Sequence, residues 1–186
     1  MPLSTLDPQS ALIVIDLQTG IAQRFGDDGL DDVVTSAAGL ARVFRAHNRP
    51  VVLVNVDAGA PGRTDAGSRV GTLPPEALEI LPELEPAEHD IRVTKRTWGA
   101  FHGTGLDHAL RARNVTQVVI TGVATSAGVE SRARAAHEHG YHVVLATDAM
   151  ADRDPQAHRH SVERIFPRLG ETASSAEIIA AVQQAG

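Results

Sequence analysis

The sequence contains no cysteine. Disulfide bonds, thiolate metal ligands and a cysteine nucleophile are therefore excluded, together with any redox chemistry based on cysteine. Aromatic residues are also scarce, with one tryptophan, one tyrosine and four phenylalanines. Two aromatic residues that fall beside polar candidates are therefore notable, because pockets for small molecules are often walled by such side chains.

Long hydrophobic runs and an excess of positive charge are missing too. No apolar run approaches the ~20 residues that span a bilayer, and the first residues lack the basic stretch of a signal peptide. The net charge of −6 argues against a surface for nucleic acid. With 186 residues, 42% of them hydrophobic, we expect one cytoplasmic domain, residues 1–186, without membrane contact.

Short, nearly continuous apolar runs predict strands that are buried on both faces. These are Ala11–Ile15, Val51–Val56, Val118–Thr121 and His142–Ala146, with a weaker candidate at Ile91–Thr94. Segments with helical character alternate with them, at Asp31–His47, Leu106–Arg113, Ala127–Gly140, Pro155–Leu169 and Ser174–Gln184. The alternation predicts an α/β fold with a mostly parallel sheet between helices. Residues 58–84, rich in glycine and proline, are expected to form a long loop with a short helical turn near Glu76–Leu81.

Ligands in such folds bind beyond the carboxyl ends of the strands, and two charged residues follow predicted strands. Asp16 ends the first strand and Lys95 closes the segment at Ile91–Thr94. A lysine beside a carboxylate can keep the acid ionised, tune it, or hold a substrate anion. A capping aspartate and a solvated lysine are the structural alternatives.

Three further features lie near these positions. Trp98 and Phe101 follow Lys95 and are candidates for a pocket wall, although plain core residues fit the pattern equally well. Small residues after the strand Val118–Thr121 can point backbone N–H groups into the crevice, where they would stabilise an anion. Arg63 and Arg69 lie in the long loop and could clamp a carboxylate, with solvated loop arginines as the slightly favoured alternative.

Three blocks of the sequence, in order, resemble the signatures of isochorismatase-like hydrolases. They are ALIVIDLQ, VTKRTWGAFHGTGLD and VVITGVATSAGVESRARAAHEHGYHVVLATDAM, and the resemblance runs from about Ala11 to Leu169. It implies a Rossmann-like three-layer sandwich with six strands, Asp16 as acid/base with Lys95 as its partner, and a cis peptide between Val123 and Ala124. It also implies a small-molecule substrate and a homo-oligomer, dimer or tetramer. The substrate contacts that we predict are Gln18, Arg63, Trp98, Phe101, Val123 and Ala124.

The sequence departs from this family at one position that matters. Most members have a nucleophilic cysteine six residues after the glycine of GVxT, where this chain has Gly128. Ser126 and Ser131 lie nearby, but neither occupies that position. The chain is similar in this respect to true isochorismatases, which also have glycine there and hydrolyse a vinyl ether. The resemblance therefore implies hydrolysis by Asp16 and Lys95 acid–base catalysis, with Gly128 leaving room for a ring.

Two other functions stay open at this stage. One is hydrolysis of an amide or ester by direct attack of water, with Asp16 as base, and the other is a binding protein that has kept the fold. A metal is not expected. Nicotinamidase-like members have an Asp-x-His pair after the second strand; here Asp57 matches the aspartate, but Gly59 stands at the position of the histidine. A catalytic zinc needs three protein ligands, so we predict neither a metal nor another cofactor.

Overall fold

A six-stranded parallel sheet organises the chain. The computed structural model describes residues 3–25, 30–57, 59, 62–65 and 72–185. The strands are β1 (Ser10–Ile15), β2 (Val51–Val56), β3 (Ile91–Lys95), β4 (Gln117–Val123), β5 (His142–Ala151) and β6 (Glu171–Ala173). Their order is β3-β2-β1-β4-β5-β6, and every neighbouring pair is parallel. This is the α/β fold that the alternation of apolar runs predicted.

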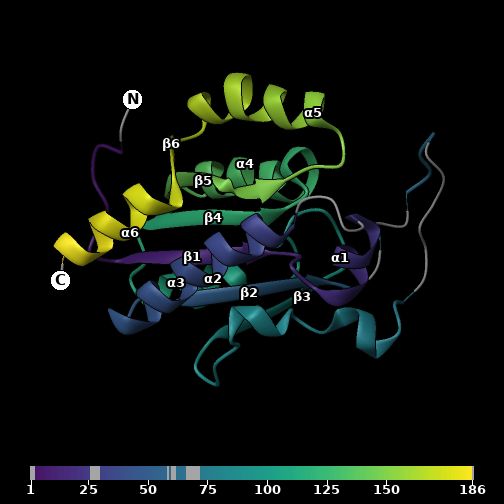
Figure 1. Ribbon diagram of the computed structural model, residues 1–186, viewed down its shortest axis with the longest axis horizontal. Coiled ribbons are helices and arrows are strands. Elements are labelled where there is room, and N and C mark those ends of the chain that lie inside the picture. The colour runs from purple at the N-terminus through teal and green to yellow at the C-terminus, as the bar shows by residue number, and fades with distance from the viewer. Residues whose placement is uncertain (1–2, 26–29, 58, 60–61, 66–71, 186) are drawn as a thin grey trace.

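Helices cover both faces of this sheet (Figure 1). They are α1 (Thr19–Phe25), α2 (Asp31–Ala46), α3 (Leu106–Arg111), α4 (Glu130–Glu138), α5 (Pro155–His160) and α6 (Ser175–Gln184). One core cluster joins α2 and α6 to one face of the sheet, and a second joins α3 and α4 to the other. Alternate residues of β1 divide between the clusters, with Leu12 and Val14 on one face and Ala11, Ile13 and Ile15 on the other. The sheet is therefore buried on both sides, as its continuous apolar strands require.

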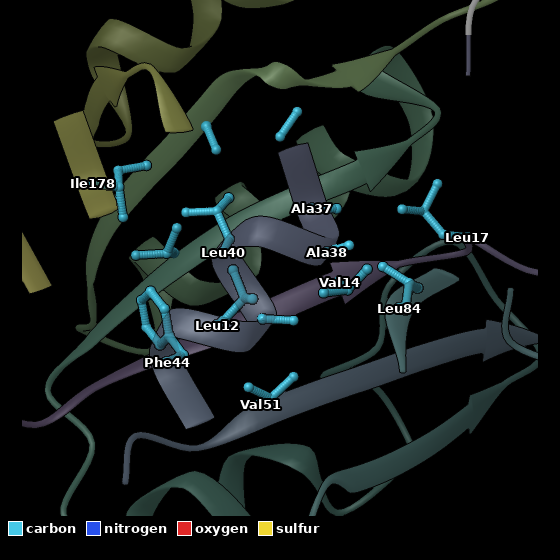
Figure 2. Packing of buried hydrophobic residues seen from close by; sticks show 14 of the residues in the cluster. Leu12, Val14, Leu17, Ala37, Ala38, Leu40, Phe44, Val51, Leu84 and Ile178 are labelled. Carbon is cyan, nitrogen blue, oxygen red and sulfur yellow. The ribbon is translucent and has the colours of Figure 1, made fainter. Parts of the chain in front are cut away.

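Helix α2 shows how the sequence pattern becomes packing. Its apolar positions recur at helical spacing, and the side chains of Ala37, Leu40 and Phe44 are all fully buried. Figure 2 shows them against Leu12 and Val51 of the sheet. Burial of a leucine or phenylalanine stabilises the fold by about 1.5–3 kcal/mol, so this face holds α2 to the sheet.

Several predicted boundaries were wrong. The segment Ala127–Gly140 is not one α-helix, because a π-turn at Thr125–Val129 precedes α4. Pro155–Leu169 likewise continues from α5 into a π-turn and a 3₁₀ turn. The predicted turn near Glu76–Leu81 is a 3₁₀ helix at Pro75–Leu78. The sequence analysis missed α1 and the three-residue strand β6, and it ended β5 at Ala146, five residues too early.

The strand order fixes where a ligand can bind. Successive strands run outward from β1 in one direction as far as β3, and from β4 in the other direction as far as β6. A crevice forms at the carboxyl ends of the two strands where the order reverses, here β1 and β4. Asp16 follows β1, and the Val123–Ala124 peptide follows β4. Within the described ranges, no helix has both the length and the hydrophobicity of a membrane span.

Candidate active site

A cavity of about 750 Å³ opens at the carboxyl ends of the strands. Its lining combines Asp16 and Lys95 with Trp98, the Val123–Ala124 peptide and Gly128. The peptide bond between Val123 and Ala124 is cis, as the resemblance implied. Residues that follow three different strands thus meet in one pocket, as we expected for the carboxyl edge of a parallel sheet.

Asp16 and Lys95 form an ion pair at the base of the cavity. The Lys95 Nζ atom lies 2.7 Å from Asp16 Oδ2, and the side chains are 2% and 9% exposed, respectively. The second carboxylate oxygen, Asp16 Oδ1, is buried and has no hydrogen-bond partner among the described residues. A buried oxygen of this kind is costly unless it is used. It is therefore the carboxylate oxygen of Asp16 that the described residues leave without a partner.

The backbone fixes this carboxylate at the end of β1. Asp16 has a positive φ of 53°, a conformation that aspartate adopts more readily than most residues. Its N–H donates to Val54 O of β2 at 2.9 Å. Lys95 is the last residue of β3, which lies on the other side of β2. The long lysine stem therefore reaches past the end of β2 to the acid.

The environment makes Lys95 an unusually acidic ammonium group. Burial and, to a smaller extent, the charge of Arg132 lower the pKa of Lys95, Asp16 raises it, and the net result is a pKa of about 8 instead of 10.5. Its Nζ also donates to Trp98 O at 3.2 Å. Lys95 is the only lysine in the chain. A lysine that titrates near neutral pH can exchange a proton with the adjacent carboxylate.

Gly128 forms part of the floor, in the π-turn between β4 and α4. It is buried, and a Cβ atom built on it would lie 3.0 Å from Val123 O and 3.1 Å from Ile15 Cγ2. Both distances are tighter than ordinary van der Waals contact, so the surroundings are shaped for a residue without a side chain. The carboxylate of Asp152 accepts hydrogen bonds from the N–H and Oγ of Ser126, both at 2.7 Å, and holds the start of this turn.

Sequence reasoning missed several charged residues of the cavity wall. Arg24 belongs to α1, which was not predicted, and Asp152 and Arg153 follow β5, which was predicted too short. Extending the apolar pattern of β5 to Met150 would have placed both residues at a strand end. Among the described lining residues there are thus more arginine and lysine than carboxylate side chains, in a chain whose net charge is −6. This balance favours an anionic ligand.

Three of the predicted substrate contacts lie outside the described lining of the cavity. The Gln18 amide is held by backbone: Nε2 donates to Val56 O (3.1 Å) and Ala77 O (2.8 Å), and Oε1 accepts from Val56 N at 2.6 Å. Gln18 therefore ties β1, β2 and the following loop together instead of facing a ligand. Phe101 packs on the rings of His139 and Tyr141.

The remaining candidates for substrate contacts are the two loop arginines and Trp98. Arg63 is exposed and is not among the described residues that line the cavity, so its predicted contact with a substrate stays a prediction. Arg69 lies outside the described residues. Trp98 does line the cavity, with 66% of its surface exposed, so it forms part of the open rim.

The residues at the possible metal position do not fit a metal ion. The Asp57 carboxylate pairs with Arg96 Nη2 at 3.1 Å and accepts from Leu73 N at 3.3 Å. In the described part of the chain, no three His, Asp or Glu residues are grouped so that they could hold a metal ion. The positive charge beside Asp57 thus comes from the guanidinium group of Arg96. That the active protein works without a metal ion stays a prediction.

Comparison with known proteins agrees with this geometry. A model of the isochorismatase domain matches residues 10–177. The chain belongs to the isochorismatase family. A solved structure of an isochorismatase family protein from Burkholderia thailandensis superposes with a TM-score of 0.91 and 39% identity, covering 98% of this chain and 99% of that chain.

Curated relatives extend the comparison to function. The uncharacterized isochorismatase family protein YwoC of Bacillus subtilis is 39% identical over 94% of this chain and 95% of its own length. Ureidoacrylate amidohydrolase RutB of Stutzerimonas stutzeri is 30% identical over 89% of this chain and 80% of its own length. The protein is thus an isochorismatase-like hydrolase, and its substrate has to be argued from its site.

Proposed function

We propose that this isochorismatase-like hydrolase cleaves a small vinyl ether that carries a carboxylate, by acid–base catalysis through Asp16 and Lys95. The observation that carries the proposal is the Asp16–Lys95 ion pair in the lining of the cavity. Its floor is Gly128, in a chain without cysteine. A vinyl ether needs a proton and a water molecule, and neither step requires a thiol.

The reaction would begin with a proton transfer from Asp16 to the vinyl methylene carbon. The carbon becomes a methyl group, and the positive charge spreads over the ether oxygen and its neighbouring carbon. Water adds to this carbon and returns a proton to Asp16, which gives a hemiketal. The hemiketal then breaks its bond to the ring oxygen, which takes up the hydroxyl proton, so that an alcohol and pyruvate leave. Lys95 orients Asp16 and can resupply its proton at the 2.7 Å contact.

The charges around the cavity support a carboxylate substrate. Lys95, Arg24 and Arg153 contribute three positive groups, against the carboxylates of Asp16 and Asp152. In the proposed first step the substrate gains positive charge close to its own carboxylate and to Asp16. The arginines would hold the substrate carboxylate by charge-assisted hydrogen bonds.

Amide hydrolysis by direct attack of water is the second candidate, and the similarity to RutB favours it. In this alternative Asp16 would take a proton from water, and the acyl oxygen would need backbone N–H groups of the turn at Thr125–Val129. The chain has no cysteine that could form a covalent thioester with an amide substrate. Amide hydrolysis is therefore the less favoured of the two reactions. A non-catalytic binding protein is the third reading.

A substrate screen with the purified protein tests these readings against one another. We expect hydrolysis of isochorismate, seen as release of pyruvate, and little hydrolysis of small amides, ureidoacrylate included. Hydrolysis of an amide alone would support the second candidate and overturn the proposal. Binding of isochorismate without turnover would support the non-catalytic reading.

The acidity of Lys95 predicts an alkaline loss of activity. Because the pKa of Lys95 is lowered to about 8, the Asp16–Lys95 pair loses its shared proton as pH rises through that value. We expect kcat/KM to be constant below pH 8 and to fall above it, whereas an ordinary lysine would act near 10.5. The measurement is kcat/KM on either side of pH 8. The guanidinium of the Lys95→Arg variant cannot release a proton, so we expect this variant to have lower activity and no decline near pH 8 in the activity that remains. A wild-type profile that stays flat above pH 8 would contradict the role of Lys95.

A side chain introduced at Gly128, on the floor of the cavity, is expected to lower activity. In Gly128→Ala the new Cβ would meet Val123 O at 3.0 Å and Ile15 Cγ2 at 3.1 Å. These neighbouring atoms would have to move by a few tenths of an ångström. Because they surround the cavity, we expect kcat/KM to fall by about tenfold. Gly128→Cys should lower kcat/KM by at least as much, and because it introduces a thiol beside Asp16 and Lys95, the same variant is assayed for weak amidase activity. Gly39→Ala is the control, since its Cβ would meet only Ile179 Cδ1 at 3.8 Å. Unchanged kinetics in both Gly128 variants would remove the steric role.

Three other expectations remain proposals. They are a homo-oligomeric state, a cytoplasmic location and activity without a bound metal ion. Sedimentation at micromolar concentration and elemental analysis of the active protein are the respective tests for the first and the third.

A further inference from the structure

Arg132 is the largest side chain that is completely buried in the described part of the molecule. It lies on α4, four residues after Gly128, and its charge has no carboxylate within ion-pair distance among the described residues. Nη1 donates to Gly128 O at 2.6 Å and to Trp98 O at 3.0 Å. Nε and Nη2 are buried without a partner in the same part of the chain. Burial of an incompletely bonded guanidinium costs free energy, so we asked which contacts of Arg132 could have a function.

The carbonyl of Trp98 connects this guanidinium to the ion pair. Its oxygen accepts from Arg132 Nη1 at 3.0 Å and from Lys95 Nζ at 3.2 Å, which the two lone pairs of a carbonyl allow. Lys95 Nζ in turn lies 2.7 Å from Asp16 Oδ2. A continuous series of contacts therefore runs from α4 through the loop after β3 to the acid.

The same Nη1 atom also holds the cavity floor. Its bond to Gly128 O ties the π-turn to the loop that carries Trp98. A Cβ on Gly128 would lie 3.3 Å from this nitrogen. The guanidinium is thus packed beside the position where a side chain at residue 128 would begin, and the absence of that side chain gives it room.

The charge of Arg132 acts on both members of the pair. The charge of Arg132 lowers the pKa of Lys95. The carboxylate of Asp16 attracts the guanidinium of Arg132 and raises its pKa. The pKa of Arg132 itself is lowered by burial only to about 10, so it stays positive at neutral pH. Other charged groups belong to the remaining cavity walls, on α1 and after β5, and they are Arg24, Asp152 and Arg153.

We propose that Arg132 is a positioning residue for the Asp16–Lys95 pair. It holds Lys95 against Asp16 through the shared Trp98 carbonyl, and its fixed charge repels that of the Lys95 ammonium group, which favours release of the Lys95 proton. The inference rests on the proposed function. Lys95 Nζ gives a proton to Asp16 Oδ2, and Asp16 passes this proton to the substrate carbon. The proton released when water adds to the substrate returns to the Asp16–Lys95 pair. Arg132 remains protonated throughout and does not touch the substrate.

The test follows the titration of Lys95 in the free enzyme, without substrate. Because the chain has one lysine, protein labelled with ¹³C and ¹⁵N in lysine gives a single side-chain signal in NMR spectra. We expect a midpoint near 8 in the wild type and an upward shift of about one pH unit in Arg132→Met and in Arg132→Gln, because a neighbouring like charge is removed. In Arg132→Lys the original signal should keep its midpoint, and the new lysine adds a second signal.

Arg134→Met is the matched control. This arginine lies two residues further along α4, is exposed, and pairs with Glu130 at 2.9 Å, so its loss should leave the Lys95 midpoint unchanged. Methionine is an unbranched side chain without charge that can fill the space of the arginine stem, and glutamine is the second neutral variant if methionine does not fold. An unchanged midpoint in the folded neutral variants would overturn the role of Arg132.

Kinetic measurements distinguish this positioning role from hydrogen bonds that only stabilise the fold. On a substrate found by the screen, we expect kcat to fall by about tenfold or more in the neutral variants with KM nearly constant, and Arg132→Lys to restore part of it. A shifted Lys95 midpoint without any substrate being hydrolysed would leave Arg132 supported and the proposed function refuted. Normal turnover with an unshifted midpoint would refute the inference about Arg132 alone.

Discussion

Asp16→Asn is expected to lower kcat by about 10²–10⁴-fold while the protein stays folded, because general acid–base catalysis contributes about that much. Asparagine has the shape of aspartate but cannot donate and recover a proton. The substitution removes the acid from the 2.7 Å contact with Lys95 and leaves the cavity otherwise unchanged. Steady-state kinetics and a thermal unfolding curve measure both parts of this expectation.

Asp148→Asn is the control for this substitution. Its carboxylate is exposed and accepts hydrogen bonds from the N–H and Oγ of Ser175, at 2.7 and 2.6 Å. The variant changes the net charge by the same amount, so a general effect of charge would appear in both. Full activity of Asp16→Asn would refute the mechanism.

Gly122→Ala is expected to cost more stability than any other substitution that we predict. Gly122 has a φ of +112°, and a Cβ on it would lie 2.1 Å from Ile15 O and 2.7 Å from Ile15 N. Both of these atoms belong to the backbone of β1, so β1 and β4 would have to move apart where they carry Asp16 and the Val123–Ala124 peptide. We expect the free energy of unfolding to fall by more than about 3 kcal/mol, measured by denaturant unfolding.

Gly140→Ala separates the two causes of this loss. Gly140 also has a positive φ, of +82°, but a Cβ there meets nothing within 4 Å. Only the conformational cost remains, about 1–2 kcal/mol. Equal losses in the two variants would show that the close approach of β4 to β1 is not what requires glycine at Gly122.

The sequence was sufficient to predict the central pair of the site and the sheet that carries it. Asp16 and Lys95 follow strands whose apolar runs are unambiguous, and parallel strands bring their carboxyl ends to one edge. The buried face of α2 was predicted for a similar reason, since its spacing is regular. In these cases a local pattern and the tertiary structure require the same residues.

Other features depend on contacts that no local pattern contains. The strand β6 has only three residues and no apolar run. An arginine in a helix is normally solvated, so nothing in the sequence around Arg132 indicates that it is buried. The Gln18 amide is taken by backbone groups 38 and 59 residues away, which is why it does not face the cavity. Long-range contacts of this kind appear only in the three-dimensional structure.

Hydrolysis of isochorismate in D₂O tests the central claim most directly. If Asp16 protonates the methylene carbon, the proton that it delivers comes from solvent, and the pyruvate released must contain one deuterium in its methyl group. ¹H NMR spectra recorded early in the reaction, with unlabelled pyruvate as a control for slow exchange, measure this. We predict CH₂D-pyruvate from the wild type and pyruvate formation that is slower by about 10²–10⁴-fold in Asp16→Asn. Pyruvate with an undeuterated methyl group, or undiminished turnover in Asp16→Asn, would contradict proton transfer to carbon by this acid.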